Sequence, residues 1–229
     1  MDVPIVRYLT ELLFPKLCVV CGDRLIEQEQ WICLRCLHHI PRTNFHLDPD
    51  NRVAQIFYGR VKLELATSFF YFSKGSKYQT LLHNLKYKGM KELGAEIGKH
   101  FGIDLMQSPD FASIDVICPV PLHPQKEKKR GYNQSWWIAS GMAQQMQKEL
   151  SADNLKRITA TETQTRKSRF ERWLNVESIF ELSNPEAFSG KHILLVDDVV
   201  TTGATLEACA QAILSKTNAR VSIATLATA

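Results

Sequence analysis

One segment, residues 194–206, constrains the fold of this chain more than any other. It begins inside a mostly apolar run, residues 192–196, that is typical of a buried strand, and it continues through the carboxylates Asp197 and Asp198. A loop of small and hydroxyl-bearing residues follows, and a helical pattern is expected over residues 205–214. A strand, a loop and a helix in this order are the unit from which parallel α/β sheets are built.

The rest of the chain beyond residue 50 repeats this alternation of short strand-like runs and helical patterns. Further strands are expected at 67–72, 116–120 and 221–226, and helices at 78–87, 91–106 and 134–150. The sequence therefore predicts an α/β body with a mostly parallel sheet flanked by helices.

The loop after the two aspartates is suited to bind a phosphate group. It consists of Thr201, Thr202, Gly203, Ala204 and Thr205. Its backbone N–H groups and hydroxyls can converge on one anion, and the start of the following helix adds a positive partial charge. Gly203 permits a close approach of the backbone and a left-handed turn. Because ligands of open α/β sheets bind at the C-terminal ends of the strands, Asp197 and Asp198 are positioned to bind vicinal ribose hydroxyls, or magnesium through water.

A plainer interpretation is that the two aspartates cap the helix. Capping needs one such residue, however, and it does not explain a hydroxyl-rich loop of this length. Neither G-x-x-x-x-G-K-[ST] nor G-x-G-x-x-G occurs in the sequence, so these two phosphate-binding motifs are excluded.

Near the N-terminus, two CxxC pairs indicate a metal site. They contribute Cys18, Cys21, Cys33 and Cys36, with eleven residues between the pairs. This spacing is compatible with one tetrahedral zinc held by four thiolates, and a redox CxxC motif is the main alternative. With four protein ligands the site would be closed, so a structural Zn²⁺, one per chain, is expected.

Composition places few limits on function. The chain has 28 basic and 24 acidic residues, a net charge of +4 that does not by itself indicate nucleic-acid binding. Two basic clusters, within 126–130 and 166–172, are expected in phosphate-facing loops, with a solvated basic surface as the alternative.

The first fourteen residues do not resemble a signal peptide, because they carry charges and their apolar residues are spaced to form one face of a helix. No apolar run in the sequence is long enough for a membrane span. A cytoplasmic protein is expected, where clustered cysteines favour metal binding.

Residues 41–50 are polar and contain two prolines, which predicts a domain boundary near residue 50. We expect a zinc-ribbon domain with an N-terminal helix over 1–50, and the α/β body over 51–229.

Several stretches together resemble one protein family. Residues 194–206 are similar to the phosphoribosyl pyrophosphate (PRPP) signature of type I phosphoribosyltransferases. Residues 118–124 followed by 130–135 are similar to the VPxH…RG[FY]NQ[AS] stretch of the ComF and GntX family. Residues 85–89 are similar to its LKYxG, and 163–176 to its TxQ…R…NV region. With the cysteines, the resemblance covers nearly the whole chain.

The resemblance implies a type I phosphoribosyltransferase fold behind a small zinc ribbon, and a site for PRPP with Mg²⁺. The threonine loop would hold the 5-phosphate, and Asp197 and Asp198 would bind the ribose. The residues expected at the pyrophosphate are Lys86, Pro121, Leu122, His123 and Arg130. Lys86 and Arg130, with the two aspartates, are the candidate catalytic groups. For His123, a loop histidine without a ligand is equally compatible with the sequence. Of Trp136 and Trp137, at least one is expected in the core, and stacking on a base is the alternative.

The resemblance also implies a mobile basic hood over the site, at residues 163–175, with Gln164, Arg169 and Arg172. The alternative for this segment is an amphipathic surface helix packed permanently on the body.

Two functions remain open at this stage. The first is transfer of the phosphoribosyl group to an acceptor with release of pyrophosphate, although no residue stands out as a general base and the acceptor cannot be read from the chain. The second is a non-catalytic PRPP-fold binding module that acts in DNA uptake during natural competence. In that case the zinc ribbon would dock on a helicase or on single-stranded DNA.

Overall fold

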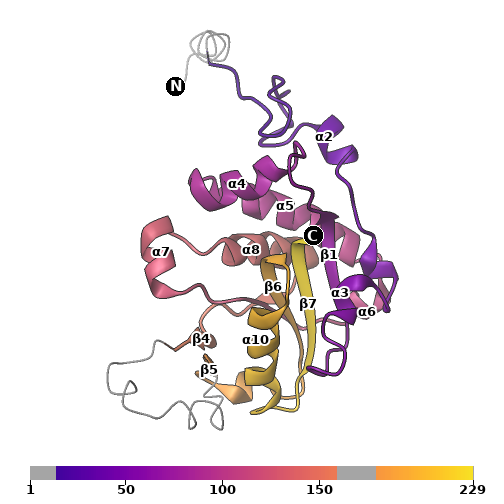
Figure 1. The fold of residues 1–229 in the computed structure, drawn as a ribbon, viewed down its shortest axis with the longest axis vertical. Helices are drawn as coiled ribbons and strands as arrows, with labels where there is room; N and C mark the ends of the chain where they lie inside the picture. The colour runs from indigo at the N-terminus through magenta and orange to yellow at the C-terminus, as the bar shows by residue number, and fades with distance from the viewer. Residues whose placement is uncertain (1–13, 159–178, 229) are drawn as a thin grey trace.

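A parallel sheet forms the centre of the protein (Figure 1). The computed structural model describes residues 14–158 and 179–228. In these residues five strands pair in the order β1-β7-β6-β2-β3, and every neighbouring pair is parallel. The strands are β1 (Ala66–Tyr71), β2 (Val116–Pro119), β3 (Glu149–Leu150), β6 (His192–Val200) and β7 (Arg220–Thr228). The predicted α/β fold is confirmed.

The central strand β6 is buried on both faces, which explains its continuous apolar sequence. Leu194 and Val196 belong to one hydrophobic cluster, whereas Ile193 and Leu195 belong to the other. Because successive side chains of a strand point to opposite faces, these two clusters are the two sides of the sheet.

Helices cover both faces of the sheet. α4 (Gln79–Tyr87), α5 (Lys91–Leu105) and α8 (Gln134–Met146) contribute to the first cluster. α3 (Arg52–Gln55) and α10 (Ala204–Leu214) contribute to the second, with the antiparallel hairpin of β4 (Leu155–Arg157) and β5 (Phe180–Leu182). α5 and α8 pack with their backbones in contact, since a Cβ at Gly98 or Gly141 would overlap a carbonyl of the other helix.

The remaining elements are short. They are α2 (Leu34–His38), the 3₁₀ turn η1 (Phe45–Leu47), α6 (Pro109–Ala112), α7 (Pro124–Arg130) and the 3₁₀ turn η3 (Pro185–Ala187). No helix in the described residues is long and apolar enough to cross a membrane.

The chain leaves β2 and β6 in opposite directions. β2 connects through α8 to β3 at one edge, whereas β6 connects through α10, on the other face, to β7. β2 and β6 are themselves neighbours. Such a reversal is a topological switch point, where ligands of open α/β sheets bind beyond the C-terminal strand ends. The ends of β2 and β6 therefore mark the candidate ligand site.

Two local predictions were wrong. The helix expected over 134–150 ends at Met146, because Gln147 adopts a left-handed conformation with φ 54° and Glu149–Leu150 pair with β2. The basic cluster at 126–130 lies in helix α7, not in a loop. The backbone N–H of Gln125 donates to His123 Nδ1 at 3.2 Å, which caps this helix, and Gly131 ends it with φ 81°.

The cysteine-containing segment packs against the body beside α4, at the top of Figure 1. Cys18, Cys33 and Cys36 belong to the same buried cluster as Leu81 and Leu85 of α4. Residues 41–47 then run along β1, where the backbone N–H of Thr43 donates to the Phe69 carbonyl at 3.1 Å. The predicted N-terminal helix lies outside the described residues.

Candidate functional site

Asp197 lies in the last part of β6, where Ser135 of α8 reaches it. The Ser135 hydroxyl donates a 2.8 Å hydrogen bond to Asp197 Oδ1, and the backbone N–H of Asp198 donates to the same oxygen at 2.8 Å. Burial, and next the neighbouring Asp198 carboxylate, raise the pKa of Asp197 to about 7. The hydrogen bond from Ser135 opposes this shift because it stabilises the ionised form.

Asp198 forms an ion pair with Lys86. Lys86 Nζ lies 2.9 Å from Asp198 Oδ2, and both side chains are largely buried, with 23% and 14% of their areas exposed. Lys86 lies in the last turn of α4, and the Tyr132 hydroxyl donates to the preceding carbonyl, that of Leu85, at 2.5 Å. The structure thus brings Lys86 to the aspartate pair, a contact that the sequence did not predict.

Residues outside the threonine loop fix its backbone in place. Gly203 is buried in the left-handed conformation, with φ 75°, and a Cβ there would lie 2.8 Å from Phe57 Cε1. Arg60 donates to the Thr202 carbonyl at 2.8 Å and pairs with Glu207 in α10. The side chains at 201, 202 and 205 are exposed. A fixed backbone with exposed hydroxyls before a helix of eleven residues is chemically suited to bind an anion.

The other predicted ligand residues lie in the segment that follows the C-terminal end of β2. Pro121, Leu122 and His123 follow this strand and are half-buried. His123 caps α7 through Nδ1, so this nitrogen already has a partner in the described chain. Arg130 is half-buried, donates to Gln134 Oε1 at 2.8 Å, and lies with its guanidinium 5.7 Å from the centre of the Tyr87 ring. Arg130 is therefore held between α8 and the end of α4.

A groove of about 570 Å³ lies beside the segment that follows β2, and its wall includes Pro121 and Leu122. Trp136 and Trp137, both half-buried, line it with their rings 5.0 Å apart in an edge-to-face arrangement. Its charged side chains are Glu127, Asp153, Lys156 and Arg157. The groove therefore combines aromatic surface with balanced charge. Neither tryptophan is among the buried core residues, so the prediction that at least one lies in the core was wrong.

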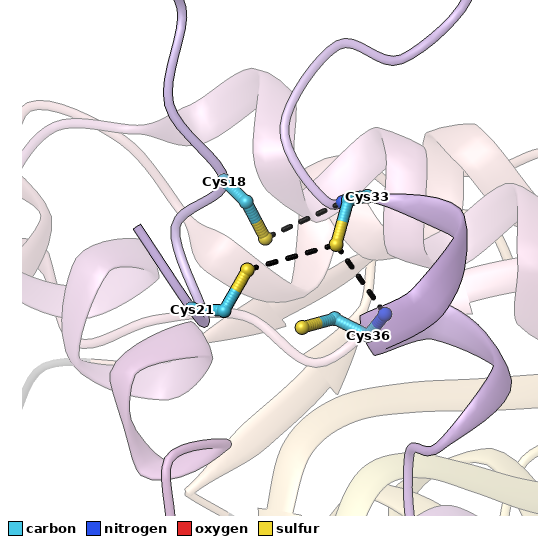
Figure 2. A group of neighbouring side chains, drawn as sticks. All are labelled: Cys18, Cys21, Cys33 and Cys36. Atoms are coloured by element: carbon cyan, nitrogen blue, oxygen red, sulfur yellow. Dashed lines mark hydrogen bonds between the residues drawn. The ribbon is translucent and has the colours of Figure 1, made fainter. Parts of the chain in front are cut away.

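The four clustered cysteines converge on one point, as Figure 2 shows. All four Sγ atoms lie within 4.8 Å of one another, and those of Cys21 and Cys33 are 3.7 Å apart. A tetrahedral site with Zn–S bonds of about 2.3 Å has sulfur–sulfur edges of about 3.8 Å, so the arrangement is compatible with one structural zinc.

Backbone N–H groups around Cys18 favour its thiolate. The N–H groups of Cys33 and Val20 point to Cys18 Sγ at 3.3 and 3.5 Å. Although burial opposes ionisation, these backbone groups and that of Cys21 lower the pKa of the Cys18 thiol to about 7. Zinc binds thiolates, so this local electrostatic environment fits the metal. Two further cysteines, Cys118 and Cys209, are buried in the hydrophobic core of the body, away from the four clustered cysteines.

Carboxylate oxygens at 197 and 198 are the hard ligands that magnesium prefers, so the residues present fit this ion as well. The predicted hood residues Gln164, Arg169 and Arg172 lie outside the described part of the chain.

Sequence reasoning missed two residues that shape the site. Ser135 is the last residue of the stretch 130–135, which carries the family resemblance, so a role for its hydroxyl could have been predicted from the sequence. Arg60 could not have been predicted in the same way. It lies in no motif, and its contact with Thr202 joins residues that are 142 positions apart in sequence.

The fold and the matched sequence define the class of this protein. A family model described as the phosphoribosyl transferase domain matches residues 135–229, which include Ser135, the aspartate pair and the threonine loop. The chain thus carries a type I phosphoribosyltransferase fold with a four-cysteine cluster at its N-terminal end.

Known proteins with similar sequences include two that the chain matches over most of its length. The chain is 27% identical over 210 residues to the DNA utilization protein YhgH of Escherichia coli strain K12, covering 90% of this chain and 88% of the relative. It is 25% identical over 226 residues to the competence protein ComFC of Bacillus subtilis strain 168, covering 87% and 89%. Among solved structures, a hypoxanthine phosphoribosyltransferase from Staphylococcus aureus is similar over 68% of this chain and 73% of that one, with 17% identity and a TM-score of 0.34. The chain is thus similar to YhgH and ComFC over most of its length, in agreement with the family resemblance of its motifs.

Proposed function

We propose that this protein binds PRPP with Mg²⁺ and transfers the phosphoribosyl group to an acceptor, with release of pyrophosphate. One observation carries the proposal. An aspartate pair, held by Ser135 and Lys86, lies at the end of β6 directly before an anchored threonine loop, at the switch point of a parallel sheet. This arrangement places acceptors for sugar hydroxyls next to donors for a phosphate.

Each part of the site then has a role. The loop 201–205 binds the 5-phosphate, and Asp197 and Asp198 bind the ribose hydroxyls or magnesium. The groups proposed for the pyrophosphate are Lys86, Pro121, Leu122, His123 and Arg130. The proposed hood contributes Gln164, Arg169 and Arg172. When bound, Mg²⁺ neutralises the charge that develops on the leaving pyrophosphate.

The work of the protein in this reaction is positioning and electrostatic stabilisation. Without ligand, Lys86 compensates the charge of Asp198 at 2.9 Å. Lys86 can exchange this carboxylate for a ligand phosphate and remain paired, provided that ribose hydroxyls or magnesium replace it as the partner of Asp198. Arg130, held by Gln134 and Tyr87, supplies a second preorganised cation.

Calorimetry with PRPP and Mg²⁺ tests the binding step. The double variant Asp197→Asn with Asp198→Asn removes two charged acceptors, and each such hydrogen bond is worth about 1.5–3 kcal/mol. Binding should therefore fall below detection while the circular dichroism spectrum is kept. Glu149→Gln, which alters an exposed ion pair in β3, is the control and should bind normally. An unchanged affinity of the double variant would exclude this site.

A panel of bases and amines as acceptors tests the transfer step, with pyrophosphate release as the measurement. Release that depends on one acceptor class supports the enzyme. Tight PRPP binding without release for any acceptor favours the second candidate function.

That second candidate is a non-catalytic PRPP-fold module in DNA uptake, working with a helicase or with single-stranded DNA. The names of the relatives YhgH and ComFC support it, as does the groove lined by Trp136 and Trp137, since aromatic rings in the wall of a groove can stack on bases. If single strands bind, replacing both tryptophans with alanine should weaken binding, and moderate salt should weaken it by orders of magnitude. Salt-insensitive binding would contradict this candidate.

The proposal includes a division of the chain into a zinc ribbon over 1–50 and a phosphoribosyltransferase-like domain over 51–229. It also places the protein in the cytoplasm, where a reducing environment keeps four clustered thiols available for zinc.

A further inference from the structure

Tyr78 joins the cysteine module, residues 14–40, to helix α4 by a buried hydrogen bond. Its hydroxyl donates to the backbone carbonyl of Cys36 at 3.0 Å, and only 6% of its side chain is exposed. Cys36 lies in α2 and is one of the four clustered thiols. Tyr78 is also the residue directly before α4. One side chain thus connects the backbone of a metal ligand with the start of this helix.

The cysteine module also shares a buried hydrophobic cluster with α4. Leu81, Leu82 and Leu85 belong to the same buried cluster as Cys18 and Cys36. Figure 1 shows the module beside this helix. Because apolar side chains of the module and of α4 belong to one buried cluster, folding of the module contributes to the stability of α4 in its present position.

The far end of α4 carries the contact to the candidate ligand site. Lys86 Nζ lies 2.9 Å from Asp198 Oδ2, and the Leu85 carbonyl accepts the 2.5 Å hydrogen bond from Tyr132. The nine residues of α4 span about 13 Å at 1.5 Å per residue. Since a helix moves as one hydrogen-bonded unit, contacts at Tyr78 help to set the position of Lys86.

The cysteine module depends on its metal for this role. Its buried side chains Val20, Leu25 and Ile40 lie in the cluster that it shares with α4, and they form no separate cluster among the described residues. Small four-thiolate modules fold as they bind zinc. Loss of the metal would therefore separate Cys36 from Tyr78 and expose the leucines of α4.

We propose that zinc in the cysteine module and PRPP with Mg²⁺ at Asp198 bind cooperatively, through α4, and that Tyr78 is a positioning residue for Lys86. This inference rests on the proposed function, because it takes PRPP as the ligand. Coupling of this kind is reciprocal, so PRPP must strengthen zinc binding by the factor by which zinc strengthens PRPP binding. Coupling between two sites is typically about 5- to 150-fold.

The first test measures zinc transfer from the full-length, zinc-loaded protein to a chromogenic chelator. Saturating PRPP with Mg²⁺ should lower the equilibrium constant of this transfer about fivefold or more, whereas Mg²⁺ alone should not. Calorimetry on the same sample shows whether PRPP binds. PRPP binding without any effect on zinc transfer would overturn the cooperativity alone. Absence of PRPP binding would overturn the proposed function and the cooperativity with it.

A matched pair of tyrosine variants tests the connection. Tyr78→Phe keeps the ring and removes the hydrogen bond to Cys36, which should reduce the effect of PRPP on zinc transfer by about twofold or more. Tyr58→Phe also removes one hydroxyl, which donates to Asp50 at 2.8 Å, but Tyr58 is exposed and lies outside α4, so the effect of PRPP should be unchanged. Equal behaviour of the two variants would contradict a role for Tyr78.

A double-mutant cycle separates positioning from general destabilisation. The loss of PRPP affinity caused by Tyr78→Phe should largely disappear in a Lys86→Ala background, because distant residues with independent effects add whereas coupled ones do not. Additive losses would overturn the positioning role.

Hydrogen exchange provides a measurement that needs no PRPP. Removal of zinc should speed amide exchange in α4, residues 79–87, and leave α10, residues 204–214, unchanged. Unchanged exchange in α4 after zinc removal would overturn the connection between the metal and this helix.

Discussion

Ser135, in the first turn of α8, donates a 2.8 Å hydrogen bond to the Asp197 carboxylate at the end of β6. The two residues are 62 positions apart in sequence. Their contact fixes the carboxylate at the topological switch point, and it favours the ionised form that binding of a hydroxyl or a metal requires.

Ser135→Ala should weaken binding of PRPP with Mg²⁺ about tenfold at pH 7, because loss of a hydrogen bond to a charged group costs about 1.5 kcal/mol. The loss should be smaller at pH 8.5, where Asp197 is ionised with or without this donor. Calorimetry at the two pH values checks this. Ser140→Ala is the control, since its hydroxyl, on the same helix, donates to the Trp137 carbonyl. A loss of the same size for both variants would contradict a specific role for Ser135.

Asp197→Asn should stabilise the ligand-free protein more at pH 8 than at pH 5. The pKa of Asp197 is raised from 3.8 to about 7 on folding, so ionisation is more costly in the folded state than in the unfolded chain. Stability from the protonated form is complete below about pH 4 and is lost as the pH rises through about 7.

Removing the ionisable group should therefore raise the free energy of unfolding at pH 8 by about 2–4 kcal/mol. Denaturant unfolding at both pH values measures it, with the exposed Asp153→Asn as control. A gain of equal size at pH 5 and pH 8 would show that the carboxylate is not the cause.

Gly203→Ala should destabilise the protein by about 1–3 kcal/mol and weaken PRPP binding, because the backbone conformation is left-handed and the added Cβ would meet Phe57. Gly190→Ala is a matched control, since Gly190 has φ 72° but no atom within 4 Å of the added Cβ. Denaturant unfolding of the two variants separates the conformational cost from the steric one. Identical losses would show that contact with Phe57 does not matter.

The purified protein should contain about one zinc per chain, measured by metal analysis. Cys21→Ser should lower the zinc content and increase proteolysis within residues 14–40, because structural zinc contributes about 10–16 kcal/mol to the folding of small zinc modules. Cys118→Ala, a buried cysteine of the body, should keep its zinc. Zinc-free protein from a freshly reduced preparation would contradict the site.

The sequence by itself determined the features that lie in short contiguous stretches. The strand, carboxylate pair, threonine loop and helix from residue 192 to 214 could be predicted because side-chain periodicity and loop chemistry act locally. The two CxxC pairs predicted the cysteine cluster for the same reason, since each turn by itself directs two thiols to one point. The alternation of strands and helices was enough to predict a mostly parallel sheet.

Short elements were harder to predict. β3 has only two residues, and its place at the sheet edge depends on pairing with β2 and not on its own pattern. Helix α7 is almost entirely charged, so it has no apolar periodicity, and its helical form follows from the cap at His123 and the turn at Gly131.

The tertiary structure alone decided which distant residues meet at the site. Lys86 reaches Asp198, and Arg60 reaches Thr202, across long separations in sequence. Tyr78 likewise reaches the Cys36 carbonyl only because α4 packs against the cysteine module. These contacts depend on the order of strands and on which face of the sheet each helix covers. Local sequence patterns carry little information about that order, because it is fixed by the packing of the whole chain into one core.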